Sequence, residues 1–404
     1  MKKILLLFCV LLVGCSNKNV TIKEEENLMK NIISMEKEEI EKYADENKLK
    51  LEWKEEYSNE PYQKVLSQSI KEGSEIKEND SLIVTISKGR LAEEVYKEHN
   101  VNELGSVPIM MYHGIHNKKN EETKYTGGNV DKDGYQRTAE AFRQDLEFYY
   151  KSGYRMIRLD DYVDGKIDVP LGYSPIILTF DDGLENNIKV TGLDENGDII
   201  IDPNSAVGIL EEFKKKYEDY QVTATFFVNG SLFNQEEYNE KILHWMVENG
   251  YDIGNHSYSH ADFTKISNDK SVEEIGKVYK QLDSIIKGKY VSIVALPFGS
   301  PYSKKHSNFD SILSGTYDGF SYETKSTLRV GWESNDSPFS KDFDPLFLKR
   351  IRAYDNEGKE FDIEQNFQIL EKKRYISDGS IYNVVVSDEN KENVNSKDLQ
   401  IITY

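Results

Sequence analysis

The chain has 404 residues, which is enough for one large domain and one small domain. Its 51 basic and 71 acidic residues give a formal net charge of −20 at pH 7. Because nucleic-acid binding requires a basic surface, this charge argues against a nucleic-acid-binding protein.

The N-terminus has the layout of a secretory signal. The sequence MKKILLLFCVLLVGC begins with two lysines, continues through an apolar stretch and reaches a small residue before Cys15. This stretch is too short to span a membrane. LVGC at 12–15 resembles the bacterial lipobox, which implies cleavage of a signal peptide over 1–14 and a lipid on Cys15. An ordinary signal peptide is the alternative. We expect a protein that is lipid-anchored at the extracytoplasmic face of the cell membrane.

Residues 15–34 are polar and predict a tether, and residues 35–89 predict a small α+β domain. Ile40, Tyr43 and Ala44 have helical spacing, and an alternating strand and then two strands around turn residues follow. The segments VLSQSIKEGSEI and VTISKG resemble a PASTA domain, a family associated with peptidoglycan. A simple spacer is the alternative, because no residue here carries decisive chemistry. Residues 90–106 predict a linker.

Residues 107–404 predict an α/β domain, because short apolar strands alternate with amphipathic helices. An Asn196-Gly197 turn within 189–203 predicts a β-hairpin insertion. The predicted strands are 107–113, 154–159, 175–180, 222–228, 251–255 and 291–296. The predicted helices are 138–153, 205–219, 236–250 and 270–288.

Polar residues follow three of the predicted strands. PIILTF runs into Asp181 and Asp182, YDIGN runs into HSYSH, and VSIVAL runs into PFGSPY. Loops at the carboxyl ends of parallel strands converge on one face of such a fold. Charge at the end of a buried strand is costly unless a positive partner lies there. His256 and His260 with one carboxylate would make a three-ligand metal site.

These motifs resemble a known family. TFDDG (179–183) and HSYSH (256–260) resemble the first two motifs of the polysaccharide deacetylases, carbohydrate esterase family 4. MYHGIH (111–116) resembles a further feature of the family, and ALPFG (295–299) resembles its third motif in a variant that lacks an arginine. The resemblance covers residues 107–350. It implies a distorted (β/α) barrel that removes acetyl groups from N-acetylated sugars of peptidoglycan or another cell-wall polysaccharide.

The resemblance also implies roles for individual residues. Asp182, His256 and His260 are expected to hold a divalent metal ion, and Asp181 to act as the catalytic base. We expect zinc, with cobalt, nickel or manganese as alternatives, because a set of two imidazoles and a carboxylate accepts several divalent ions. Such an ion lowers the pKa of its water toward ~7, and the neighbouring carboxylate can accept the proton.

Pro297, Phe298 and Trp332 are the expected substrate-binding residues. Backbone N–H groups near Phe298 could stabilise the oxyanion. Trp332 could stack on a sugar ring, and a core tryptophan is the alternative.

Two features depart from the family pattern. Ala295 occupies the position of an arginine that usually orients the base. Downstream, FDPLFLKRIRAY contains Arg350 and Arg352, and Arg350 resembles the arginine that the variant branch carries there. We predict that Arg350 pairs with Asp181; a surface arginine is the alternative.

The second departure concerns the general acid. Members of the family usually have a late histidine that protonates the leaving amine, and this sequence lacks it at the expected position. The strand-like SIYNVVVSDEN has Ser387 and Asp388 where that histidine is expected. Candidates for its role are His113, His306 and Asp378. Loss of a general acid typically costs ~10²–10⁴ in rate. A catalytically weak or inactive wall-binding lipoprotein, and a deacetylase of a secreted exopolysaccharide, therefore stay open as alternatives.

Overall fold

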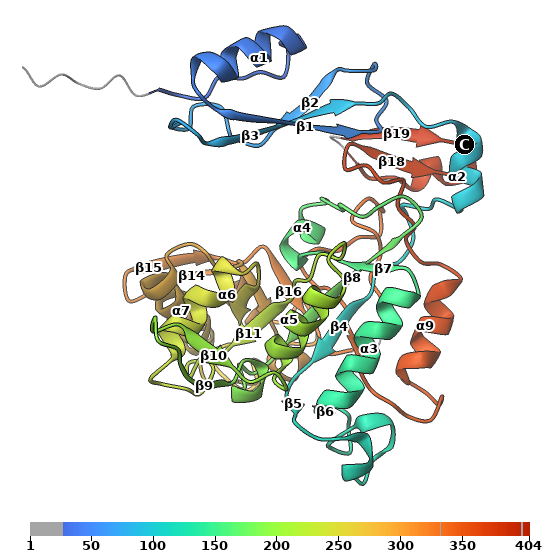
Figure 1. The fold of residues 1–404 in the computed structure, drawn as a ribbon. Coiled ribbons are helices and arrows are strands. Elements are labelled where there is room, and N and C mark those ends of the chain that lie inside the picture. Colours follow the sequence, from blue (N-terminus) through green and yellow to red (C-terminus); the bar gives the residue numbers. More distant parts are fainter. Residues whose placement is uncertain (1–26, 332, 397–398) are drawn as a thin grey trace, which may run out of the picture. The chain divides into compact units, whose positions relative to one another are not determined.

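The computed structural model describes residues 27–331, 333–396 and 399–404 (Figure 1). It contains two compact units, of which the first ends at Glu55 and includes Gln63–Ile86, and the second comprises Glu56–Tyr62 and Ser87–Tyr404. Cys15 with the predicted signal peptide, and also Trp332, lie outside the described residues. No helix among the described residues is long and apolar enough to cross a lipid bilayer.

The small unit combines one helix with a three-stranded sheet. Helix α1 (Lys37–Glu46) is followed by β1 (Lys50–Glu56), β2 (Val65–Gln68) and β3 (Ser81–Ser87), and the sheet order is β1-β3-β2. The helix buries one apolar stripe in a common core with the strands, as its spacing predicts. The residues of this stripe are Ile40, Tyr43 and Ala44.

The predicted tether is wrong at its C-terminal end. Met29 and Ile32 are 2% and 0% exposed and belong to the core of the small unit. The backbone N–H of Met29 donates to the carbonyl of Ser74 at 2.8 Å. Burial of these two apolar side chains stabilises the ordered segment, so the small domain begins before residue 35.

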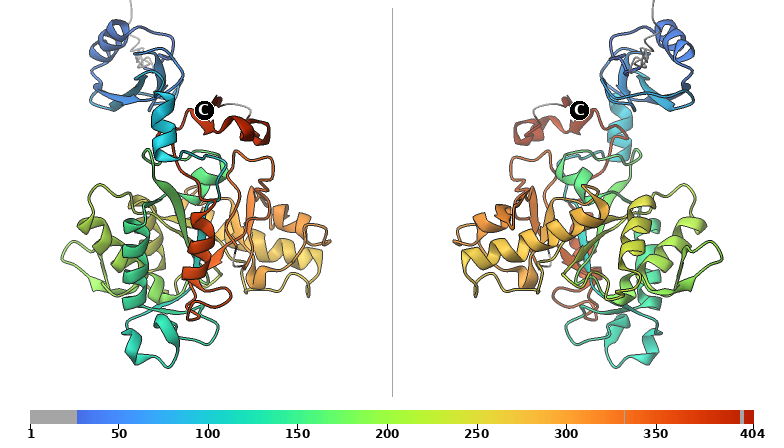
Figure 2. Two further views of the ribbon diagram at one scale, coloured as in Figure 1. Left: turned by 90° about the vertical axis from the view of Figure 1, so that its right-hand side faces the viewer. Right: turned by 90° about the vertical axis from the view of Figure 1, so that its left-hand side faces the viewer.

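The large unit is built on an eight-stranded sheet in which all neighbouring strands run parallel (Figures 1 and 2). The order is β16-β13-β12-β11-β8-β4-β17, and β7 also pairs with β8. The six strands predicted from the sequence all belong to it. Its strands are β4 (Ile109–Tyr112), β7 (Tyr154–Met156), β8 (Ser174–Phe180), β11 (Thr225–Val228), β12 (Asp252–Asn255), β13 (Ile293–Ala295), β16 (Ser326–Leu328) and β17 (Ile351–Arg352).

The chain at 348–352 links the two ends of this sheet. Leu348 forms a parallel bridge with Leu328 at the end of β16, and Ile351 pairs with Met110 of β4. The sheet is therefore the distorted (β/α) barrel that the resemblance implied. Arg350 lies between the two pairings and is fully buried.

Amphipathic helices cover the outer face of the sheet (Figure 2). Helices α3, α5 and α7 each begin after a Thr or Ser whose side-chain oxygen accepts a backbone N–H of the first turn. Inside this layer the rings of Phe180 and Phe226 stack at 4.7 Å. The long helices are α3 (Ala139–Lys151), α5 (Ala206–Lys216), α6 (Asn239–Glu248), α7 (Asn268–Ile286) and α9 (Ile363–Glu371).

Shorter elements complete the large unit. The predicted hairpin insertion is present as β9 (Val190–Leu193) and β10 (Ile199–Ile201), which pair antiparallel. Three further pairs of strands and three short helices also occur. They are β5 (Ile115–His116), β6 (Arg137–Thr138), β14 (Ser314–Tyr317), β15 (Phe320–Glu323), β18 (Asn383–Val386), β19 (Gln400–Thr403), α2 (Glu93–His99), α4 (Leu159–Val163) and α8 (Phe309–Leu313).

The predicted linker contains a helix, and the predicted C-terminal strand is present but lies outside the eight-stranded sheet. Residues 90–106 include α2, and Tyr96 packs in one cluster with Val385 and Ile402. Within the part of the chain that the structure describes, β18 pairs with β19 alone, in a parallel two-stranded sheet separate from the eight-stranded one. Ser387 and Asp388 therefore do not lie at the end of a barrel strand. The preceding strand β18 packs instead against apolar residues of 90–106.

Two buried carboxylates fasten the 90–106 segment to the C-terminal segment. Glu103 is 0% exposed and accepts hydrogen bonds from the backbone N–H of Val385 at 2.7 Å and the Tyr375 hydroxyl at 2.8 Å. Asp378, 1% exposed, accepts one from the backbone N–H of Ser380 at 2.7 Å. Burial and the nearby Asp378 raise the pKa of Glu103, and burial raises the pKa of Asp378 to about 6.

These pKa values predict a dependence of stability on pH. The folded state keeps the proton of Asp378 up to a pKa of about 6, above the ordinary value of 3.8. Protonated Asp378 therefore contributes fully to the free energy of unfolding below the ordinary pKa. As the pH rises through about 6 this contribution is lost, and the free energy of unfolding falls by an amount on the order of 2–3 kcal/mol. We expect Asp378→Asn, which cannot ionise, to show a smaller fall in Tm over this range than the wild type. Thermal unfolding by circular dichroism measures it, with exposed Asp388→Asn as control. An Asp378→Asn profile parallel to that of the wild type would contradict this assignment.

Candidate metal centre and active site

Strand β8 places two consecutive carboxylates at the carboxyl end of the sheet. Every residue of Ser174–Phe180 is buried, and Asp181 follows with 1% of its surface exposed. The chain then turns sharply, with left-handed φ values of +75° at Asp182 and +56° at Gly183. A Cβ on Gly183 would lie 2.1 Å from the carbonyl oxygen of Leu232, so only glycine fits here.

The loop after β12 carries the two histidines in a strained backbone. Ser257 and His260 have φ values of +58° and +54°, a region that non-glycine residues rarely adopt. The side-chain oxygen of buried Asn255 accepts the backbone N–H of Ser257 at 2.9 Å. The backbone N–H of His256 donates to the carbonyl of Val228 at the end of β11. These bonds to buried partners hold the loop in its unfavourable conformation.

Glu274 of α7 also holds this loop, and the sequence analysis missed it. Its carboxylate is 0% exposed and accepts the backbone N–H of Ser259 at 2.7 Å and the Ser259 hydroxyl at 2.8 Å. A sequence signal existed, because Glu274 falls at helical spacing among Ser271, Ile275 and Val278, on the buried face of the helix. A carboxylate on such a face requires hydrogen-bond partners.

Asp182, His256 and His260 converge on one point. One ligand atom from each lies within 4.8 Å of the others. The Asp182 Oδ1 atom is 3.2 Å from His256 Nε2 and 3.5 Å from His260 Nε2. The structure thus brings together the three residues that the sequence analysis proposed as metal ligands, from the ends of β8 and β12.

The hydrogen bonding of His256 shows that this cluster fits a cation. Its Nδ1 lies 2.8 Å from the backbone oxygen of Ala295, and because a carbonyl only accepts, the ring proton of the neutral imidazole is on Nδ1. The buried Nε2 atom then presents a lone pair toward the Asp182 carboxylate, and among the described residues no group donates a hydrogen bond to it. Two facing acceptors are stabilised when a positive ion lies between them. A carbonyl that orients a ligating imidazole is also the usual surrounding of a protein metal site.

Asp181 does not join this cluster, because Arg350 engages both of its oxygens. The two guanidinium N–H···O distances are 2.7 and 2.6 Å, and both side chains are buried. Arg350 also donates to the Thr179 hydroxyl at 3.2 Å. The pairing predicted from the sequence is therefore present. Burial would raise the pKa of Asp181, but Arg350, His256 and His113 together lower it well below its ordinary range.

Two of the expected substrate-binding residues, Pro297 and Phe298, lie in the loop beside His260. Pro297 is buried, whereas Phe298 is 55% exposed and has a left-handed φ of +59°. The Phe298 ring lies 4.6 Å from the His260 ring, measured between centroids. Among the described residues no acceptor receives the backbone N–H of Phe298. This N–H is therefore available to bind an oxyanion.

The three candidates for the general acid lie in different surroundings. His113 follows β4, and because Tyr112 opposes Phe180 in the β4–β8 register, His113 lies next to Asp181. Burial lowers the pKa of His113, and Asp181 and Asp182 are near enough to oppose this shift. The Nδ1 atom of His306 accepts from the backbone of Asn308, and Asp378 belongs to the buried Glu103 cluster. Only His113 of the three is shown beside the carboxylates.

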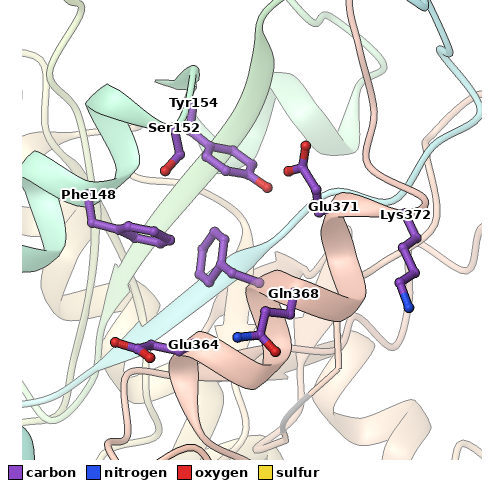
Figure 3. A pocket seen from close by; sticks show the side chains of 8 residues that line it. Phe148, Ser152, Tyr154, Glu364, Gln368, Glu371 and Lys372 are labelled. Atoms are coloured by element: carbon purple, nitrogen blue, oxygen red, sulfur yellow. The ribbon is translucent and has the colours of Figure 1, made fainter.

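A separate pocket lies between α3 and α9, on the outer helical layer of the large unit (Figure 3). Phe148 and Phe367 contact each other edge to face across it, at 5.1 Å between ring centroids. None of the motif residues contributes to this pocket. The chemistry is therefore assigned to the strand ends and not to this hollow.

Protons should compete with a metal ion for His256. Burial would lower its pKa, but Asp181 and Asp182 outweigh burial and raise the pKa above 6.5. Because a metal ligand must be unprotonated, we expect the zinc affinity of the purified protein to fall from about pH 8 to about pH 6. Asp182→Asn should weaken zinc binding by about 100-fold or more, since even outer-shell changes cost 10–100-fold. Isothermal titration calorimetry measures both effects, with the exposed Asp269→Asn as control. Wild-type affinity in Asp182→Asn would refute the ligand assignment.

Comparison with known proteins gives matches for both units. Residues 169–310 match the family model for polysaccharide deacetylases, and residues 28–88 match the model for the PASTA domain. The uncharacterized protein YlxY of Bacillus subtilis is 32% identical over 77 residues, which are 19% of this chain and 23% of that protein. The peptidoglycan-N-acetylmuramic acid deacetylase PdaA of Bacillus subtilis is 26% identical over 159 residues, 39% of this chain and 44% of PdaA. The matched regions thus span less than half the length of these relatives.

Among solved structures, the Streptococcus pyogenes deacetylase PplD in complex with acetate aligns with a TM-score of 0.46 and 19% identity. The alignment covers 65% of this chain and 97% of PplD. The two family models carry the assignment, and they agree with the motifs and with the parallel sheet that bears them. The chain contains a domain of the polysaccharide deacetylase family, preceded by a PASTA domain.

Proposed function

We propose that this protein is a metal-dependent N-deacetylase that removes acetyl groups from N-acetylated sugars of peptidoglycan or another cell-wall polysaccharide. The observation that carries the proposal is the division between the two carboxylates. Asp181 is held by Arg350 and is free of the metal cluster, whereas Asp182 joins the imidazoles. The family model and the similarity to PdaA, a deacetylase of peptidoglycan N-acetylmuramic acid by its name, support the reaction type.

Asp182, His256 and His260 would hold the divalent ion. Zinc is our first choice, and cobalt, nickel and manganese are the alternatives, because the donor set accepts several divalent ions. When bound, such an ion polarises the acetyl carbonyl and acidifies water at the site. Asp181 accepts the proton of the attacking water. Arg350 keeps Asp181 ionised and fixes its direction through two parallel hydrogen bonds.

Other groups serve the developing charges. The unpartnered backbone N–H of Phe298 lies in the loop beside His260 and would donate to the oxyanion. His113 would donate a proton to the leaving amine from the other side of Asp181. In this proposal His113 takes the place of the late histidine.

Release of acetate tests these roles. Purified full-length protein with zinc should release acetate from N-acetylglucosamine oligomers or from peptidoglycan fragments. We expect Asp181→Asn and His113→Gln each to lower kcat by roughly 10²–10⁴-fold. His306→Gln is the matched control, and we expect it to retain wild-type kcat.

Three results would contradict parts of this proposal. Wild-type kcat in His113→Gln would remove that residue from the mechanism. Metal binding without acetate release from any wall fragment or oligomer would indicate a non-catalytic wall-binding protein. Activity confined to a secreted exopolysaccharide would contradict the proposed wall substrate.

We further propose that Cys15 carries a lipid that tethers the protein at the extracytoplasmic face of the membrane, beside its polymer. The LVGC sequence at 12–15 and the PASTA domain support this placement. We expect wild-type protein to fractionate with membranes and to incorporate radiolabelled palmitate, and Cys15→Ala to lose the label. Unlabelled wild-type protein would contradict the anchor.

A further inference from the structure

Arg352 lies near the candidate active site but takes no part in the proposed reaction. It is the last residue of β17 (Ile351–Arg352) and lies two residues after Arg350 in the chain. Strand β17 pairs in parallel with β4, so the carboxyl ends of both strands lie at the same edge, where His113 follows β4.

Aromatic rings connect Arg352 to His113. The guanidinium carbon of Arg352 lies 4.7 Å from the ring centroid of Tyr135 and 4.8 Å from that of Tyr354. The Tyr135 ring in turn contacts the His113 ring edge to face, at 5.0 Å between centroids. Packing against two rings restricts the guanidinium to few conformations, which lowers the entropy cost of binding a ligand.

Unlike the two buried arginines of the unit, Arg352 has no anionic partner among the described residues. Arg137 pairs with Asp145, and Arg350 with Asp181. Among the described residues no carboxylate forms an ion pair with Arg352, and its buried Nε–H has no acceptor. The side chain is partly exposed. In a chain with a net charge of −20, a restricted and unpaired cation one aromatic ring away from His113 is suited to bind an anion.

We propose that Arg352 binds a carboxylate on the N-acetylated glycan that enters the site, and so selects acidic glycans over neutral ones. The inference rests on the proposed function for the glycan itself. A guanidinium offers parallel N–H donors that match the two oxygens of a planar carboxylate. Such a group occurs as the lactyl ether of muramic acid or as a uronic acid, and both present the same chemistry to Arg352.

Equilibrium binding to the full-length zinc-loaded protein tests this inference. The probes are a peptide-free N-acetylmuramic acid oligosaccharide, the same oligosaccharide with its carboxylates converted to amides, and an oligosaccharide of N-acetylglucosamine and glucuronic acid. We expect wild-type protein to bind the first more tightly than its amide by roughly 10–100-fold, the range for a hydrogen-bonded charge. Comparable binding of the glucuronic acid probe would identify uronic acids as ligands, and weak binding would identify the lactyl group.

Three variants isolate the role of the guanidinium. Arg352→Gln should lose the preference for the carboxylate and bind the amide as the wild type does. Arg352→Lys should keep part of the preference, because it retains the charge without the planar fork. Arg155→Gln is the matched control, because Arg155 also packs on tyrosine rings, at β7, and should behave as the wild type. Equal Tm values for Arg352→Gln and wild type exclude unfolding as the cause.

Equal losses for the acid and amide probes in Arg352→Gln, or no loss for either, would overturn the inference. Acetate release measured on the same samples separates it from the proposed function. A carboxylate preference that depends on Arg352, without acetate release, would refute the deacetylase and leave the binding site standing. Acetate release with no preference for the carboxylate would refute the Arg352 binding site and leave the deacetylase standing.

Discussion

Groups that donate electron pairs are crowded at the carboxyl ends of β8 and β12, and the candidate site depends on the cations that compensate them. Two carboxylates and two imidazoles meet at the end of an apolar barrel, where uncompensated charge is costly. Arg350 neutralises Asp181 from within the barrel. The Asp182 carboxylate faces the lone pair of His256, and no arginine or lysine among the described residues pairs with it. The different roles proposed for these adjacent aspartates follow from that asymmetry.

The backbone at this site is strained, and the rest of the domain holds it in place. Asp182, Ser257, His260 and Phe298 all have left-handed conformations. Each costs free energy that side chains elsewhere must offset. The hydrogen bonds from Ser259 to Glu274 fix the loop after β12 onto helix α7, and Gly183 packs closely against the carbonyl oxygen of Leu232. The apolar core shared by the parallel strands and the inner faces of the helices offsets the strain at the strand ends.

The sequence predicted the large elements well, because their apolar periodicity is a local property. The strands that carry the motifs, the flanking helices and the β9–β10 hairpin lie where the pattern indicated. The tether and the linker were predicted wrongly, since the burial of Met29 and Tyr96 depends on partners distant in the sequence. The same applies to β18, whose pairing with β19 leaves no local signal.

The site shows the same limit. Motif spacing brought Asp182, His256 and His260 together, and family resemblance suggested Arg350 as the partner of Asp181. The buried role of Glu274 and the unpaired state of Arg352 depend on tertiary contacts, so the sequence analysis did not assign them functions. Whether a residue has a partner is a property of the fold. That property separates Arg350, which is already neutralised, from Arg352, which is not.

The central claim is that one cation is held jointly by the ends of two strands. The most direct measurement is the anomalous scattering of a crystal of the full-length protein soaked in zinc. The account predicts one strong peak in contact with Asp182, His256 and His260 at once, with Asp181 still bound to Arg350. A zinc-saturated crystal with no peak between these three side chains, or with zinc bound to Asp181 and Arg350 displaced, would contradict it.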